Sequence, residues 1–238
     1  MRVNYQSFEF VLKPQENIIL PAYKGSTFRG GFGNVFRRIV CALKKNDCKD
    51  CLLKEKCIYS YVFETPPPAE TKVMKKYTAA PHPFIIEPPV DRKRAYTPND
   101  VIKFNLVLVG RALEYLPYFI YTFNELGGIG IGKGRGKYLL EKVSADSKRI
   151  YSSETKVIDP FSKITCAIPF EAICDDCSRK SLLTLEFLTP TRVVRNADLV
   201  LDLEFDILIR QLLRRIALLA YFHEGHDTSS IDFKGIIE

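Results

Sequence analysis

The chain opens with an alternation of apolar and polar side chains over residues 5–12, in which Phe8, Phe10 and Leu12 share one side. A period of two residues is typical of a strand with one buried face, so we expect a strand here. After Pro14 and Pro21, apolar residues recur at helical spacing over residues 28–43. This spacing predicts that a helix follows the strand.

The same reading predicts an alternation of strands and helices up to residue 149. The expected elements are strands at 5–12, 101–109 and 137–143, helices at 28–43 and 114–126, and short strands near 71–77 and 84–87. Gly127 and Gly128 are expected to end the second helix. The order approximates the β-α-β-β-α-β order of a ferredoxin-like domain, an α+β fold of the RRM type. Residues 46–100 form an irregular insertion that contains cysteines, and seven of the 14 prolines lie within residues 66–89 of it.

A second domain is expected to begin near residue 181, after a connection over residues 150–180. Residues 182–188 have a strand pattern, and residues 203–224 form the most regular amphipathic helix of the chain. We expect Asp202 to cap the start of this helix and Gly225 to end it. One strand and one helix cannot close a core, so residues 181–238 are interpreted as the start of a second, truncated ferredoxin-like domain.

Positive charge is concentrated in the first part of the chain. Residues 1–149 hold 25 Lys and Arg against 14 Asp and Glu, whereas residues 171–238 hold 8 against 12. A basic first domain favours a polyanionic partner, although it is also compatible with a merely soluble basic surface. No secretory pattern or apolar stretch of about 18 residues occurs, which indicates a cytoplasmic protein without a membrane partner.

Six glycines lie between Gly127 and Gly136, together with Lys133, Arg135 and Lys137. The spacing resembles that of a phosphate-binding P-loop, but Gly134 stands where magnesium ligation needs a hydroxyl, and the run joins a helix to a strand. We therefore expect a loop whose backbone amides approach an RNA phosphate while the three cations neutralise its charge. A flexible basic hairpin is the alternative.

A second glycine-rich segment, residues 25–33, opens the first predicted helix. One interpretation is structural, with glycines that let the helix lie close to its neighbours. In the other, the helix start and its cations line an RNA path. The cations in question are Lys24, Arg29, Arg37 and Arg38.

Four cysteines lie within 17 residues, in the spacing C-x6-C-x2-C-x5-C. They are Cys41, Cys48, Cys51 and Cys57. In a reducing compartment this cluster favours a structural zinc site over a disulfide framework, with an iron–sulfur cluster or free cysteines as alternatives. Cys174 and Cys177 form a separate C-x2-C pair, and Cys166 is expected to be buried.

Together these motifs resemble one family, the repeat-processing endoribonucleases of CRISPR systems in the RAMP superfamily. The similarity rests on LPAYKGSTFRGGFG at residues 20–33, on CKDCLLKEKCIYSYVFE at 48–64, on the glycine-rich run, and on Leu-Thr-Pro-Thr at 188–191. The resemblance implies tandem ferredoxin-like domains that bind CRISPR repeat RNA, with other CRISPR-associated proteins as further partners. It also implies a second domain that continues beyond residue 238. The apolar stripe of the helix at residues 203–224 is expected to be covered by the first domain, by a second copy of the chain, or by segments of a longer protein.

The resemblance further implies cleavage of RNA without a metal cofactor, by attack of a ribose 2′-hydroxyl on the adjacent phosphate. The first predicted helix lacks the histidine that some relatives carry there. The candidates for proton transfer are therefore Tyr23 and Lys24, followed by His82, while His223 and His226 are interpreted as structural or solvent-exposed. Two alternatives stay open, a non-catalytic RNA-binding subunit of a CRISPR effector complex and a small metal-cluster redox protein.

Overall fold

The computed structural model describes residues 2–44, 47, 48, 50–67, 71, 80–167, 184–195 and 198–228. Its strands are β1 (Arg2–Pro14), β2 (Ile18–Ile19), β3 (Phe84–Glu87), β4 (Ala95–Tyr96), β5 (Ile102–Val109), β6 (Tyr138–Ala145), β7 (Lys148–Ser152), β8 (Ile164–Ala167), β9 (Val194–Arg195) and β10 (Asp198–Leu199). Its helices are α1 (Gly25–Val40), the π-helix η1 (Ser60–Glu64), the 3-10 helix η2 (Gly110–Tyr115), α2 (Leu116–Ile129) and α3 (Phe205–Glu224).

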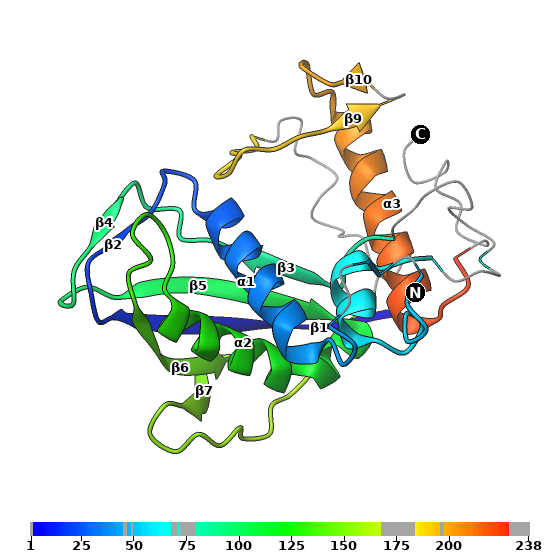
Figure 1. Cartoon of the computed structure of the whole chain (residues 1–238). Coiled ribbons are helices and arrows are strands. Elements are labelled where there is room, and N and C mark those ends of the chain that lie inside the picture. The colour runs from blue at the N-terminus through cyan, green and yellow to red at the C-terminus, as the bar shows by residue number, and fades with distance from the viewer. Residues whose placement is uncertain are drawn as a thin grey trace.

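A mixed α/β architecture is built on one antiparallel sheet in the order β3-β5-β1-β6-β7, with β8 paired to the first residues of β1. Helices α1 and α2 cover one face of this sheet (Figure 1). The described residues contain no helix that is both long and apolar enough to cross a membrane.

Phenylalanine rings fill the space between the sheet and the two helices. Phe32 of α1 stacks on Phe119 of α2 with ring centroids 5.0 Å apart, and Phe10 of β1 lies 5.2 Å from Phe123. These four rings are fully buried. Since burial of one such side chain contributes about 1.5–3 kcal/mol, this aromatic layer is a major source of the stability of the domain.

The expected strands at 5–12, 84–87, 101–109 and 137–143 and both expected helices of the first domain are confirmed, with shifted ends. Helix α1 begins at Gly25 and stops at Val40, and α2 continues through Gly127 and Gly128 to end before Gly130, whose φ is +87°. Gly127 lies inside the helix and allows close packing instead of ending it. A Cβ at this position would collide with the carbonyl oxygen of Tyr138 on β6.

The expectations for the C-terminal part are only partly met. Helix α3 begins at Phe205 with Glu204 in the N-cap position, so the cap predicted at Asp202 is wrong, whereas Gly225 ends the helix with φ +72° as expected. Residues 184–188 form no strand. Residues 72–79, residues 182 and 183, and the Cys174–Cys177 pair lie outside the described residues, as does the side chain of Cys166.

The C-terminal half of helix α3 packs on the first domain. Leu219 and Ala220 form a small buried cluster with Val3 and Val109, and the Glu224 carboxylate accepts hydrogen bonds from the backbone and side-chain nitrogens of Asn4, at 2.7 and 3.2 Å. The N-terminal half of α3 extends past the end of the sheet (Figure 1). Its large apolar residues Phe205 and Leu212 are 62 % and 49 % exposed.

Two histidines are built into the packing of this junction in their neutral form. The pKa of His223 is lowered to about 4, mainly by burial. The hydrogen bond to Pro81 raises this pKa, whereas the charges of Arg111 and Arg215 lower it. Burial also lowers the pKa of His82 to about 4, helped by Arg29, Arg215 and His223. Protonation of either ring therefore opposes folding.

Acidification should destabilise the protein well before its carboxylates titrate. Both histidines bind protons more weakly in the folded chain than at their ordinary pKa of 6.5, so stability is full above that value and falls as the pH drops toward 4. We expect the melting temperature to decrease between pH 7 and pH 5, and to decrease less in the variant His82→Asn/His223→Gln. An equal decrease in the variant would show that these rings do not control the pH dependence.

Candidate nucleic-acid interface

Three short segments that are distant in sequence form a small antiparallel layer at one end of the molecule. β2 pairs with β4, and Ile19 of β2 also forms a bridge with Lys133 in the glycine-rich run. The backbone nitrogen of Leu20 donates to Arg94 O at 2.8 Å, and that of Lys133 donates to Ile19 O at 2.9 Å. The layer, here called the basic corner, comprises residues 18–20, 91–96 and 130–137 (Figure 1).

The glycine-rich run folds into a tight turn in which four backbone amides are already hydrogen-bonded. The nitrogens of Gly130, Ile131, Lys133 and Arg135 donate to Leu126 O, Gly136 O, Ile19 O and Gly132 O, respectively. Gly132 has a φ of +72°, and a Cβ there would collide with Ile19 O. The expected cradle of free amides is therefore wrong for these four residues, and any phosphate must be bound mainly by side chains.

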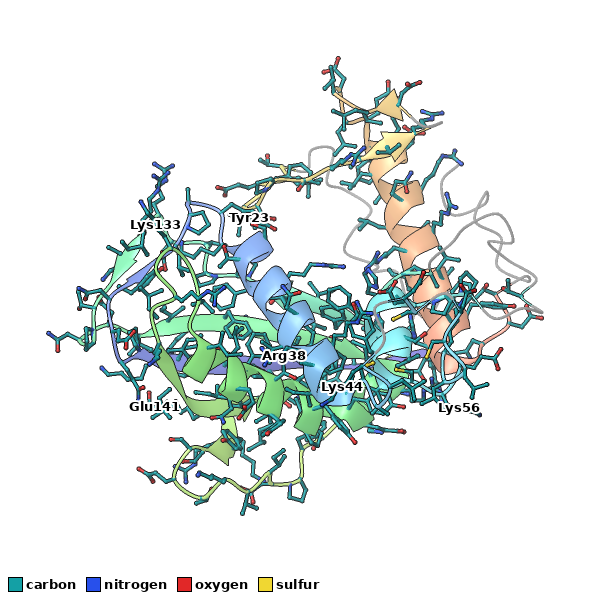
Figure 2. All side chains as sticks on the ribbon, viewed as in Figure 1. Tyr23, Arg38, Lys44, Lys56, Lys133 and Glu141 are labelled. Carbon is teal, nitrogen blue, oxygen red and sulfur yellow. The ribbon has the colours of Figure 1, made fainter. Side chains whose placement is uncertain are left out.

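Four cations of the basic corner point to solvent. Arg92, Arg94, Lys133 and Arg135 are exposed, and none takes part in an ion pair among the described residues. Figure 2 shows the Lys133 side chain extending outward at this corner. The other predicted cation of the turn, Lys137, is exposed and lies 3.8 Å from the Glu16 carboxylate. The corner thus offers a concentrated positive charge to a polyanion.

Lys24 supports the basic corner from inside and does not face solvent. Its side chain is fully buried, and its Nζ donates to Asp91 O at 2.7 Å and lies 3.1 Å from Asp91 Oδ1. The same carboxylate oxygen accepts hydrogen bonds from Tyr96 Oη at 2.8 Å and from the backbone nitrogen of Lys93 at 3.0 Å. Direct RNA binding or proton transfer by Lys24 does not fit this burial.

The environment of Asp91 keeps its carboxylate charged. Partial burial raises its pKa, but hydrogen bonds from Tyr96 and Lys24 outweigh burial, so the pKa lies below its ordinary value. The ionised carboxylate in turn fixes the Lys24 ammonium. This pair holds the start of the turn from which Arg92 and Arg94 project.

The predicted arginines of α1 extend the positive surface away from the corner. The Arg29 guanidinium lies over the rings of Phe63 and Phe84, at 5.3 and 5.6 Å, and that of Arg37 lies 5.4 Å from the Tyr59 ring centroid. Arg38 is exposed and, with Arg37 and Lys44, lines a cavity of about 550 Å³ near the ends of α1 and α2. Lys133, Tyr23, Arg38 and Lys44 follow one another along the α1 side (Figure 2).

The open face of the sheet is a poor alternative for nucleic acid. Glu9 and Lys103 form an ion pair across β1 and β5 at 3.5 Å, and Glu87 and Glu141 are exposed on β3 and β6. The described open-face positions of β1 and β5, over residues 7–11 and 103–107, include no aromatic ring on which a base can stack. The α1 side is therefore the better candidate interface.

The three candidate catalytic residues have different surroundings and do not form a common site. Tyr23 is 44 % exposed at the start of α1, whereas Lys24 is bound to Asp91. His82 Nδ1 lies 2.9 Å from Thr65 Oγ1, and its ring lies close to Phe63 and Phe84. Its neutral, partly buried ring is tied to packing rather than to the other two residues.

The four cysteines of the cluster are partly buried, and none of them forms a disulfide bond. Cys48 and Cys57 contact the main core. Burial raises the pKa of the Cys48 thiol, and the nearby Cys41 and Cys57 raise it further. Within the described ranges, no three side chains among His, Cys, Asp and Glu are placed to hold a metal ion. Four sulfur donors suit zinc chemically, and the zinc site stays a prediction.

The fold and the basic corner define a mixed α/β domain with an antiparallel sheet and a cationic end. Residues 3–163 match the family described as AF_1859_N, N-terminal domain, and the chain belongs to this family. An uncharacterized protein of Archaeoglobus fulgidus is 26 % identical over 147 residues, which are 61 % of this chain and 48 % of that protein. The chain thus spans about half the length of this relative.

A more distant similarity concerns a solved structure, the Csm3-Csm4 subcomplex in the type III-A CRISPR-Cas interference complex. The TM-score is 0.38 at 15 % identity, covering 64 % of this chain and 92 % of the matched chain. A TM-score this low does not establish a common fold.

Sequence reasoning missed Arg92 and Arg94, which lie in the proline-rich insertion. The signal available was the run Asp91-Arg92-Lys93-Arg94, with three consecutive cations after one acid. Its meaning depends on the pairing of β2 with β4, which brings this run beside Lys133.

Replacing Lys24 should loosen the basic corner. In Lys24→Met, the Asp91 carbonyl and carboxylate lose a buried charged donor, so we expect the free energy of unfolding to fall by about 1–3 kcal/mol in chemical denaturation. Lys103→Met removes an exposed lysine paired with Glu9 and should cost less than about 1 kcal/mol. Equal stability of the two variants would contradict the anchoring role of Lys24.

The zinc prediction is tested by measuring metal content and thermal stability on the same samples. If the four thiolates bind zinc, Cys51→Ser should lower both the metal bound per chain and the melting temperature, because metal binding to the folded site is coupled to folding. Metal-free protein with the melting temperature of the untreated protein would reject the site.

Proposed function

We propose that this chain is an RNA-binding protein of the CRISPR-associated RAMP class, which binds RNA through the basic corner and along α1. The observation that carries the proposal is the set of four exposed cations, Arg92, Arg94, Lys133 and Arg135, without ion-pair partners among the described residues. The motifs that resemble CRISPR endoribonucleases give the proposal its class. CRISPR repeat RNA and other CRISPR-associated proteins are the proposed partners.

The topology supports a ferredoxin-like first domain as part of this proposal. Along the chain, the sheet strands and their helices follow the order β1, α1, β3, β5, α2, β6. Their order across the sheet is β3-β5-β1-β6, and every pairing is antiparallel. This order supports the proposal, because it matches the β-α-β-β-α-β pattern of a ferredoxin-like unit.

The chemistry of the corner favours contact with the RNA backbone over reading of bases. Arginine side chains bind phosphate oxygens in a bidentate manner, and their positions are fixed here by the strand pairing beneath them. Because four of the turn amides are already bonded, we assign the contact mainly to the side chains. Side-chain contacts to phosphates position RNA without specifying its sequence.

Cleavage of precursor CRISPR RNA is the narrower form of the proposal. Tyr23, Lys24 and His82 do not form an acid–base pair beside the proposed phosphate path, which favours the non-catalytic alternative, an RNA-binding subunit. Catalysis by this chain would therefore need groups other than the three that the sequence singled out.

Removing charge from the basic corner should weaken RNA binding and its dependence on salt. For Lys133→Ala/Arg135→Ala/Lys137→Ala we expect lower affinity for single-stranded RNA of any sequence, with the slope of log K against log salt reduced by ~0.7 for each phosphate that is no longer neutralised. Arg92→Gln/Arg94→Gln should act in the same direction. The matched control is Lys103→Gln on the open face, which should leave the slope unchanged.

Fluorescence anisotropy over a series of salt concentrations measures this slope. Unchanged affinity in both corner variants would remove the corner from the RNA path. Cleavage is tested by incubating labelled repeat RNA with the same protein samples in EDTA. If the wild-type protein hydrolyses the RNA and the corner variants hydrolyse it more slowly, the endoribonuclease form is supported. Intact RNA that stays bound would support the binding subunit.

A further inference from the structure

Tyr23 is an exposed aromatic residue where the basic corner meets α1. It is 44 % exposed and lies two residues before Gly25, at which the helix begins. Figure 2 shows Tyr23 and Lys133 at the same end of the molecule. The ring therefore lies on the surface proposed to bind RNA and not in the core.

Backbone contacts on both sides of Tyr23 keep it beside the corner. Three residues earlier, the Leu20 nitrogen donates to Arg94 O at 2.8 Å. One residue later, the Lys24 ammonium donates to Asp91 O at 2.7 Å. Because consecutive Cα atoms are only about 3.8 Å apart, Tyr23 lies close to the loop that holds Asp91 and Arg94. The ring thus shares a surface with the exposed arginines of that loop.

Gly25 lets the Tyr23 ring lie against the start of α1. Gly25 is buried, and a Cβ at this position would collide with Oη and Cζ of Tyr23. The phenol ring is therefore folded back over the backbone of Gly25, which the absence of a side chain allows. A side chain that is already placed loses less conformational freedom when it contacts a ligand.

The Tyr23 ring has no ring partner in the described part of the chain. By contrast, Tyr59 stacks on Phe63, and the Arg111 guanidinium lies over the Tyr61 ring. The other exposed aromatic residues among those described lie outside the basic corner, and they are Tyr118, Tyr121, Phe187 and Phe205.

An aromatic ring beside exposed cations distinguishes between kinds of polyanion. Cations alone suit any polyanion, whereas proteins that bind single-stranded nucleic acid combine a positive surface with aromatic rings on which bases stack. The first turn of α1 contains no acidic residue, and the nearby Asp91 carboxylate is paired with Lys24. Phosphates on either side of a base at Tyr23 therefore meet little negative charge.

We propose that Tyr23 stacks on one nucleobase of a single-stranded RNA whose phosphates contact the cations of the basic corner, an inference that rests on the proposed function. The contact selects single strands, because neighbouring bases cover both faces of a base inside a duplex. It tolerates any sequence, since every base has a π-face. The role requires the ring of Tyr23 and not its hydroxyl.

The test measures the binding of three labelled probes by fluorescence anisotropy. The probes are a single-stranded oligouridylate, an abasic oligomer of equal length with the same sugar–phosphate backbone, and an RNA duplex. Tyr23→Ala should weaken oligouridylate binding at least about fivefold, the lower end of the effect of losing one stacked base. Its affinity for the abasic oligomer and for the duplex should equal that of the wild type.

Two further variants separate stacking from other roles of Tyr23. Tyr23→Phe keeps the ring and should bind oligouridylate as the wild type does. Gly25→Ala displaces the ring and should weaken oligouridylate binding without weakening abasic binding. The slope of log K against log salt should stay unchanged in Tyr23→Ala, because no phosphate contact is lost.

The matched control is Tyr121→Ala, which removes a 52 % exposed tyrosine from α2, outside the basic corner. Its affinity for oligouridylate should be unchanged. The melting temperature of Tyr23→Ala should stay close to that of the wild type, which separates impaired binding from impaired folding.

Three results would overturn the stacking role. They are unchanged oligouridylate binding in Tyr23→Ala, an equal loss with the abasic oligomer, and a loss in Tyr23→Phe as large as in Tyr23→Ala. The proposed function survives each of these results if the wild type binds RNA and the corner variants reduce the salt slope. Absence of RNA binding by the wild type would overturn the proposed function and the stacking role together.

Discussion

Strand β1 is the element on which the rest of the structure depends. It pairs with β5 on one edge, and with β6 and β8 on the other, and its buried side chains Phe8 and Phe10 contribute to the aromatic core. Because the rings of α1 and α2 stack against this layer, both helices are fixed on one face of the sheet. The end of α3 also uses β1, through Val3 and Asn4. A change in the register of this strand would displace every other element.

The position of the basic corner follows from that sheet and from one buried charge. The chain leaves β1 at Pro14, forms β2, and reaches α1 through Lys24, whose ammonium is sequestered with Asp91. Burying a charge is costly unless it is paired and hydrogen-bonded, and here the partner carboxylate and carbonyl meet that requirement. The consequence is a turn that holds Arg92 and Arg94 outward beside Lys133. The buried pair of Lys24 and Asp91 thus positions the exposed arginines of the corner.

The basic corner differs from a preformed phosphate cradle in its chemistry. Its exposed side chains present positive charge on a surface where four amides of the glycine-rich turn are already hydrogen-bonded. Such a surface suits an extended polyanion.

Local patterns in the sequence determined the strands and helices of the first domain, because their periods arise from which side chains face the core. The strand at residues 5–12 and the helix that follows it were predictable for this reason, as was the basic glycine-rich run. The same patterns did not distinguish Lys24 from Arg94, since both are cations beside turn residues. Only the tertiary structure buried one and exposed the other. The pairing of β2 with β4 and with Lys133 joins segments more than seventy residues apart, and the reach of His223 to Pro81 spans 142 residues. Contacts at such separations depend on strand order and packing, which leave no periodic trace in the sequence.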